Sequence, residues 1–125
     1  MKYPSVRQIK VLHEELIRAS GGAFGLRDEG LLDSAVKSPL QTFDGQALYP
    51  SAIDKASRLA FGLITNHSVL DGNKRIGPHA MLVLLALNGL ELSYEDEDLI
   101  ALILHIAAGE TDEPVLHQWI EDHLV

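Results

Sequence analysis

Apolar residues recur at intervals of three and four along most of the chain, which is the period of an amphipathic helix. The first such run is Val6, Ile9, Leu12, Leu16 and Ile17. Ser5 precedes this run with a side chain suited to an N-cap, and Gly21-Gly22 follows it as a stop signal. The pattern therefore predicts a first helix that begins after Ser5 and ends before Gly21.

The same spacing predicts five further helices. They are expected at about 28–36, at 51–66, from the turn at 71–73 to the residue before Asn88, at 95–108 and at 113–124. The segment from Leu40 to Pro50 has no periodicity and contains glycine, so it is interpreted as a loop or a short hairpin. No stretch shows sustained strand alternation, and the predicted fold class is all-α.

One predicted helix is apolar on nearly all sides, which is typical of a helix in the middle of a domain. Its apolar residues are Met81, Leu82, Val83, Leu84, Leu85 and Leu87. A length of 125 residues suits one domain with one core. We therefore expect residues 1–125 to form a single compact helical domain around this central helix.

Composition and charge narrow the classes of function. The chain has no cysteine, which excludes disulfides and thiolate chemistry. A net charge of −8 argues against direct nucleic-acid binding and favours a protein partner. Residues 1–18 lack the pattern of a secretory signal, and the apolar run at 81–87 is too short to span a bilayer. We expect a cytoplasmic protein without membrane contact.

The turn before the central helix carries the candidate chemistry, in the string Asp71-Gly72-Asn73-Lys74-Arg75. Gly72 allows backbone N–H groups to face a ligand, and the following helix N-terminus adds partial positive charge. Asn73 can donate from its amide, Lys74 supplies a point charge, and Arg75 supplies a fork for phosphate oxygens. The turn is therefore a candidate phosphate-binding site.

Two neighbouring side chains extend this site toward catalysis. Asp71 is a carboxylate beside the anion site, where such a group typically holds a magnesium ion that bridges to phosphates. His67 is a candidate general base for an attacking hydroxyl. A plain loop with solvated charges, and a histidine that only stabilises a helix end, are the alternatives. The apolar helices on both sides favour a phosphoryl- or nucleotidyl-transfer site.

The string from His67 to Arg75 resembles the signature of the Fic/Doc family, H-x-F-x-[DE]-G-N-[GK]-R. The resemblance extends to Gly21-Gly22 with the segment 26–32, to Tyr49-Pro50-Ser51, and to the segment 107–110. Lys74 and the short chain are similar to the death-on-curing (Doc) branch, whose members are toxins of toxin–antitoxin pairs.

The resemblance implies roles for individual residues. His67 would activate a target hydroxyl, Asp71 would position Mg²⁺, Gly72 and Asn73 would line an anion hole, and Lys74 and Arg75 would bind the phosphates of ATP. A flap would dock the target segment by strand addition, and it would contain Thr42, Phe43, Asp44 and Gly45. Doc-type members transfer the γ-phosphoryl group of ATP to a threonine of elongation factor Tu, whereas classical Fic members transfer AMP.

Three residues depart from the family pattern. Val69 replaces a phenylalanine that anchors the loop, and Ser68 replaces a common proline. Pro78 stands where longer Fic motifs have a second arginine, which argues against AMP transfer. Pro78 also predicts either a late start of the central helix after Gly77 or a distorted first turn. AMP transfer stays an alternative, and these three residues favour a further one, a catalytically degenerate binding protein.

A built-in inhibitory segment of the form [ST]-x-x-x-E-[GN] does not occur in the sequence. An active protein of this kind would therefore require a separate antitoxin. The remaining histidines have no metal-ligand spacing and are expected at the surface or in hydrogen bonds. They are His13, His79, His105, His117 and His123.

Overall fold

The helix boundaries in the computed structural model, which describes all residues 1–125, follow the capping residues of the sequence. Ser5 accepts a hydrogen bond from the Gln8 N–H, and the Gln8 side chain accepts one from the Ser5 N–H. Ser51 and Asp54 form the same reciprocal pair. The helices are α1 (Val6–Ser20), α2 (Glu29–Lys37), α3 (Ala52–Thr65), α4 (Asn73–Leu87), α5 (Asp96–Ala107) and α6 (Glu113–Asp122), with a 3₁₀ turn at Ser38–Leu40. The all-α prediction is confirmed.

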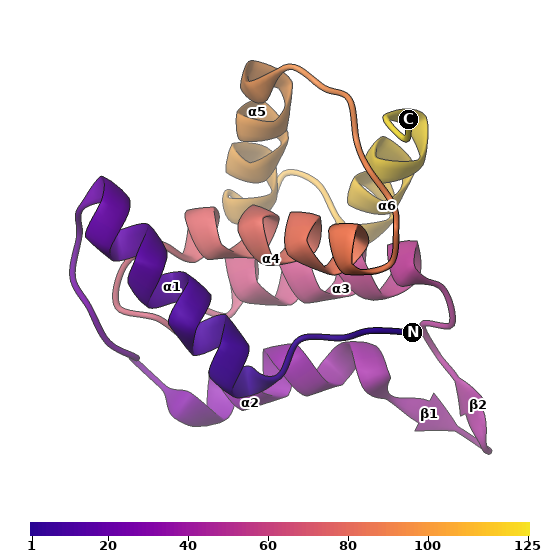
Figure 1. Cartoon of the computed structure of the whole chain (residues 1–125), viewed down its shortest axis with the longest axis horizontal. Coiled ribbons are helices and arrows are strands. Elements are labelled where there is room, and N and C mark those ends of the chain that lie inside the picture. Colours follow the sequence, from indigo (N-terminus) through magenta and orange to yellow (C-terminus); the bar gives the residue numbers. More distant parts are fainter.

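A short hairpin interrupts the helices, as the loop at 40–50 allowed. Strands β1 (Thr42–Phe43) and β2 (Gln46–Ala47) pair antiparallel, with Thr42 opposite Ala47. Asp44 and Gly45 both have positive φ, 54° and 78°, as a two-residue hairpin turn requires. The hairpin projects from the end of the molecule where α3 begins (Figure 1).

Helices α3 and α4 lie side by side through the middle of the molecule, with α1 packed against α4 near its start and α5 and α6 on one side (Figure 1). Seven residues of α3 and six of α4 are buried. Leu87 is 42% exposed, and Leu82 and Val83 are half-buried. The centre of the domain is therefore formed by α3 and α4 together. Helix α4 buries one broad face against α3, and its opposite side lies at the surface.

Close approach of the two central helices depends on Gly77 of α4. A Cβ at Gly77 would lie 2.6 Å from Ile64 Cγ1 and 3.1 Å from the Ala60 carbonyl oxygen. Both atoms belong to α3, and neither is the free end of a flexible side chain. Gly77 therefore sets the spacing between α3 and α4. It lies about one and a half helical turns beyond Gly72, at the candidate phosphate-binding turn.

Helix α4 begins at Asn73, so the alternative of a late start after Gly77 is wrong. Gly72 caps the helix with φ of 89°, and its carbonyl accepts from the Arg75 and Ile76 N–H groups. Pro78 lies inside the helix. Its missing N–H leaves the Lys74 carbonyl without an intrahelical donor, and this loss falls in the first turn, where the helix end is near solvent.

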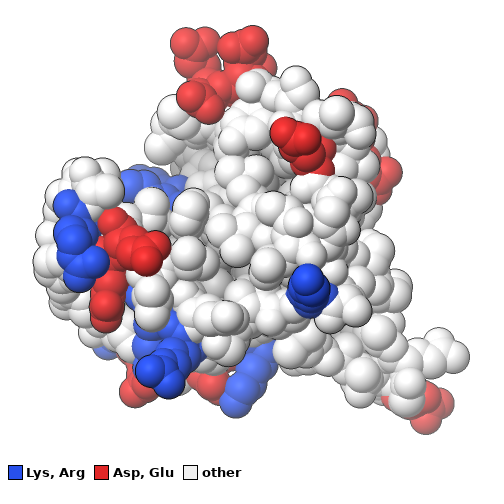
Figure 2. Space-filling view, in the orientation of Figure 1, with Lys and Arg blue, Asp and Glu red and all other residues white.

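Charge is distributed unevenly over the surface. Figure 2 shows acidic side chains at the top, where α5 begins with Asp96, Glu97 and Asp98, and most visible Lys and Arg side chains on the lower half. Asp and Glu side chains also lie among these Lys and Arg side chains, so the visible lower half carries both signs of charge (Figure 2). None of the helices combines the length and apolar character needed to cross a bilayer.

Candidate active site

The loop from Asn66 to Gly72 is held by main-chain contacts with the segment before α2. Val69 pairs with Leu26 in an isolated antiparallel bridge, and the Leu70 N–H donates to the Gly25 carbonyl at 3.2 Å. The Ser68 carbonyl accepts from the N–H groups of both Arg27 and Asp28. Val69 is itself buried in the core. Backbone pairing therefore anchors the loop although the family's phenylalanine is absent.

Asn73 clamps the same loop with its side chain. Its Nδ2 donates to the Val69 carbonyl at 3.1 Å, and its Oδ1 accepts from the Val69 N–H at 3.3 Å. The sequence suggested that this amide would donate to an anion. In the structure the amide closes the turn instead, so it is not free to donate to an anion.

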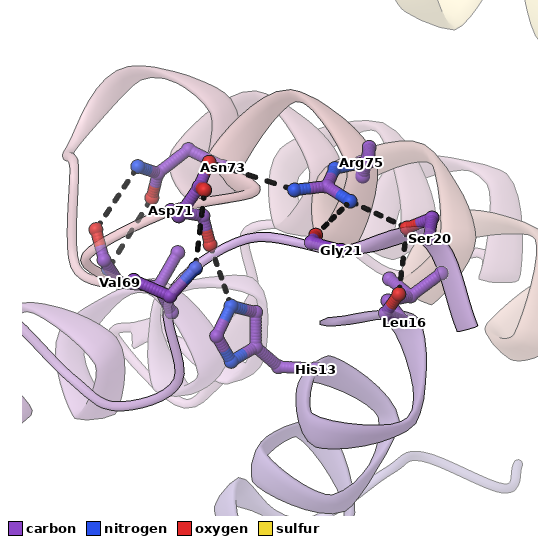
Figure 3. Close-up of polar contacts among 9 residues, drawn as sticks. His13, Leu16, Ser20, Gly21, Val69, Asp71, Asn73 and Arg75 are labelled. Carbon is purple, nitrogen blue, oxygen red and sulfur yellow. Dashed lines mark hydrogen bonds and ion pairs between the residues drawn. The ribbon is translucent and has the colours of Figure 1, made fainter. Parts of the chain in front are cut away.

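His13 of α1 holds the turn from the other side, and sequence reasoning gave it no role in the site. Its side chain is 2% exposed, and Nε2 donates to the Asp71 carbonyl oxygen at 2.6 Å (Figure 3). His13 falls on the face of α1 defined by Ile9 and Ile17, four residues to either side. A histidine on an otherwise apolar face is the signal that identifies it.

Asp71 and Arg75 are tied to each other and to the end of α1 (Figure 3). Arg75 Nη2 lies 3.5 Å from Asp71 Oδ1, while Nη1 donates to the Ser20 hydroxyl and to the Gly21 carbonyl. Asp71 Oδ2 accepts from the Ala23 N–H at 3.2 Å. A phosphate bound by Arg75 must therefore compete with the carboxylate and with the end of α1.

Gly22 allows the chain to pass this close to Asp71. Its φ is 119°, and a Cβ at this position would collide with the Asp71 carboxylate. The glycine pair that the sequence marked as a helix stop therefore also brings the Ala23 N–H within reach of Asp71.

The predicted site residues meet around one cavity of about 500 Å³. Its lining consists of Ile64, His67, Leu70, Asp71, Gly72, Asn73, Lys74 and Arg75. His67 is exposed at the rim with φ of 54°, a conformation that histidine adopts more readily than most residues. The structure thus places the candidate base and the candidate phosphate cradle at the same opening.

The predicted flap does not reach this cavity. Thr42, Phe43, Asp44 and Gly45 belong to the hairpin at the N-terminal end of α3, whereas the motif turn follows its C-terminal end (Figure 1). A helix of 14 residues separates the two ends by about 21 Å. Phe43 is 74% exposed and is no part of the cavity wall.

The cavity suits an anion at the start of α4. Gly72 offers no side-chain cap, so N–H groups of the first turn remain available beside the positive end of the helix. Lys74 is exposed and forms no ion pair, in contrast to Arg75. Pro78, at the position of a second arginine in longer motifs, lines an adjacent apolar groove of about 390 Å³ with Lys74 and Leu82.

Magnesium fits this site only together with a phosphate ligand. Asp71 is the one carboxylate of the cavity, its side chain is 48% exposed, and no group of three His, Asp or Glu side chains could hold an ion alone. Mg²⁺ is commonly held by one or two carboxylates plus substrate phosphates and water. The donor set is compatible with that arrangement.

Comparison with known proteins identifies a family that shares the segment containing this cavity. Residues 3–85, from the start of the chain into α4, match the Fic/DOC family. Toxin Doc from Mycolicibacterium smegmatis is 44% identical over 75 residues, which is 60% of this chain and 58% of that protein. The motif turn and the cavity around it lie within the matched family region. The chain therefore belongs to the Fic/DOC family.

Proposed function

We propose that the chain transfers the γ-phosphoryl group of ATP to a serine or threonine hydroxyl of a protein. The observation that carries the proposal is that His67 and the residues from Gly72 to Arg75 line one cavity at the start of α4. A general base and a phosphate cradle within one opening are what phosphoryl transfer requires, because catalysis there is mostly positioning and charge stabilisation.

The proposed step begins with ATP phosphates at the N-terminus of α4, beside Lys74. The target hydroxyl oxygen forms a bond to the γ-phosphorus, the bond from that phosphorus to the bridging oxygen breaks, and ADP leaves. The hydroxyl proton passes to the His67 ring. Asp71 would hold Mg²⁺, which supplies charge neutralisation on the phosphates when it is bound.

The biological role proposed is that of a Doc-like toxin. The support is the 44% identity to a protein named Toxin Doc, with the motif inside the matched family region. The target would be a translation factor such as elongation factor Tu, which places the reaction in the cytoplasm. A separate antitoxin protein would restrain the activity.

A binding-only protein is the second candidate, and a specific observation favours it. Arg75 is engaged by Asp71, Ser20 and Gly21, and the Asn73 amide is engaged by Val69. If these contacts persist when ATP binds, only Lys74 and the helix N-terminus hold the phosphates. Such a site binds a nucleotide without activating its γ-phosphorus.

A labelled transfer assay tests the proposal. Purified protein, elongation factor Tu and Mg²⁺ are incubated in parallel with ATP labelled on the γ-phosphate or on the α-phosphate, with His67→Ala as control. Label on the target from γ only, lost in the variant, is the expected result. Label from α would instead establish AMP transfer. ATP binding with no label on any protein of a translation extract would favour the binding-only candidate.

A further inference from the structure

We propose that His13 is a positioning residue, which orients the peptide between Asp71 and Gly72 so that its N–H group faces the phosphate cavity. The inference rests on the proposed function and assigns a role to a buried side chain outside the motif. His13 is 58 residues from Asp71 in sequence, and its Nε2 donates to the Asp71 carbonyl at 2.6 Å.

The geometry of a peptide bond carries the argument. The chain has no cis peptide, so the carbonyl of residue 71 and the N–H of residue 72 point in opposite directions across one plane. His13 fixes the carbonyl on the side of α1. The Gly72 N–H is therefore turned away from α1, and Gly72 lies in the wall of the cavity that also contains Lys74.

The surroundings of His13 indicate that its role is the hydrogen bond, since packing on this apolar face does not require a histidine. Its neighbours on the same face of α1 are Ile9 and Ile17, which are also buried. The Asp71 carbonyl is the hydrogen-bond acceptor of the ring. Gly72, with φ of 89°, has a flexible backbone that could otherwise rotate this peptide.

Two substitutions separate the hydrogen bond from the packing. His13→Leu keeps a buried side chain of similar volume but removes the donor. His13→Gln keeps an amide N–H near the position of Nε2. Ile9→Val, on the same face and away from the turn, serves as a control for the stability of α1. All four proteins are compared for melting temperature, for ATP affinity with Mg²⁺, and for the amide chemical shift of Gly72 without ligand.

We expect His13→Leu to weaken ATP binding by about 10- to 100-fold and to shift the Gly72 amide resonance. His13→Gln should stay within about threefold of the wild type and retain the Gly72 resonance. Ile9→Val should lower the melting temperature without altering ATP affinity. Equal affinities in His13→Leu and wild type would overturn the positioning role, as would loss of binding in both His13 variants.

The failure of the proposed function would be distinguishable. If the wild type itself does not bind ATP, the nucleotide proposal fails, and the Gly72 resonance decides the role of His13. An unchanged resonance in His13→Leu would then overturn the inference, and a shift rescued by His13→Gln would support it.

Discussion

Two polar clusters lie at opposite ends of α3, and they differ in how completely their groups are paired. The cluster at its start joins α3 to α6. His117 Nε2 lies 2.7 Å from Asp54 Oδ1, and Arg58 Nη1 lies 3.1 Å from Glu113 Oε2. Ser51 adds two hydrogen bonds to Asp54 through its capping box. Every charged group named in this cluster has a partner inside the chain.

The motif cluster beyond the end of α3 is only half paired. Asp71 and Arg75 engage each other, but His67 and Lys74 form no ion pair and face the cavity. The N-terminus of α3 has a side-chain cap, whereas that of α4 has none. A cluster whose polar groups are all paired stabilises the fold, whereas unpaired polar groups remain available to bind a ligand.

The largest expected difference between the two clusters is in transfer activity when the histidine of each, His67 or His117, is replaced by alanine. His67→Ala should reduce transfer by about 10²- to 10⁴-fold. It should change stability by no more than about 1 kcal/mol, because the residue is exposed and only its positive φ disfavours alanine. His117→Ala should retain transfer and destabilise the protein by about 1 kcal/mol, because it leaves Asp54 without this partner. Transfer assays and urea unfolding of both variants measure this. Loss of transfer in His117→Ala, or retained transfer in His67→Ala, would contradict this division between a structural and a functional cluster.

The next effect concerns the helix contact that supports the motif cluster. Gly77→Ala should destabilise the protein by about 1–3 kcal/mol, because the new methyl group overlaps Ile64 and the Ala60 carbonyl. Gly62→Ala is the matched control within α3, since its Cβ would lie 3.5 Å from Ala35 Cβ, an ordinary contact. Gly62→Ala should be neutral or stabilising by up to about 1 kcal/mol. Equal denaturation midpoints for the two variants would refute the proposed role of Gly77.

A smaller effect, on ATP affinity, is expected from replacing Lys74, which forms no ion pair in the motif cluster. Lys74→Ala should weaken ATP binding by about tenfold and leave stability unchanged or slightly higher, because a cation in the first turn opposes the helix dipole. Lys37→Ala, at an exposed lysine 3.0 Å from Asp33, is the matched control and should not change ATP affinity. Calorimetric titration with ATP and Mg²⁺ measures both. Unaltered affinity in Lys74→Ala would remove Lys74 from the cradle.

The sequence predicted the features that depend on neighbours within a few residues. Ser5 and Gly21 act on backbone groups three or four positions away, so their capping roles are visible as local patterns. The loop or short hairpin expected between Leu40 and Pro50 is equally local, and the structure closes it with a turn at Asp44-Gly45. For the same reason the motif string could be interpreted as one turn with a helix behind it.

Most contacts that shape the site join residues about forty or more positions apart, and no periodicity encodes them. His13 reaches Asp71, and Arg75 reaches Ser20, only because α1 crosses the start of α4 at a particular angle. The hairpin lies away from the motif turn because it precedes α3 in the chain, whereas the motif turn follows α3 (Figure 1). The start of α4 was uncertain because Pro78 allowed either a late start after Gly77 or a distorted first turn, and in the structure α4 begins at Asn73 with Pro78 inside the helix.

The smallest expected effect tests whether the paired cluster is structural through its dependence on pH. Burial alone would raise the pKa of Asp54, but hydrogen bonds from Ser51 and the hydrogen bond and charge of His117 hold that pKa below its usual range. A lowered pKa in the folded state means that the unfolded chain binds the proton more readily. The stabilisation is therefore present above about pH 4 and is lost as the pH falls through the lower folded pKa. Asp54→Asn should make the free energy of unfolding less dependent on pH in this acid range. Asp33→Asn, which changes the net charge equally at the ion pair with Lys37 on α2, controls for charge. Identical acid-range slopes for wild type and Asp54→Asn would show that the pairing at this end of α3 does not contribute to stability.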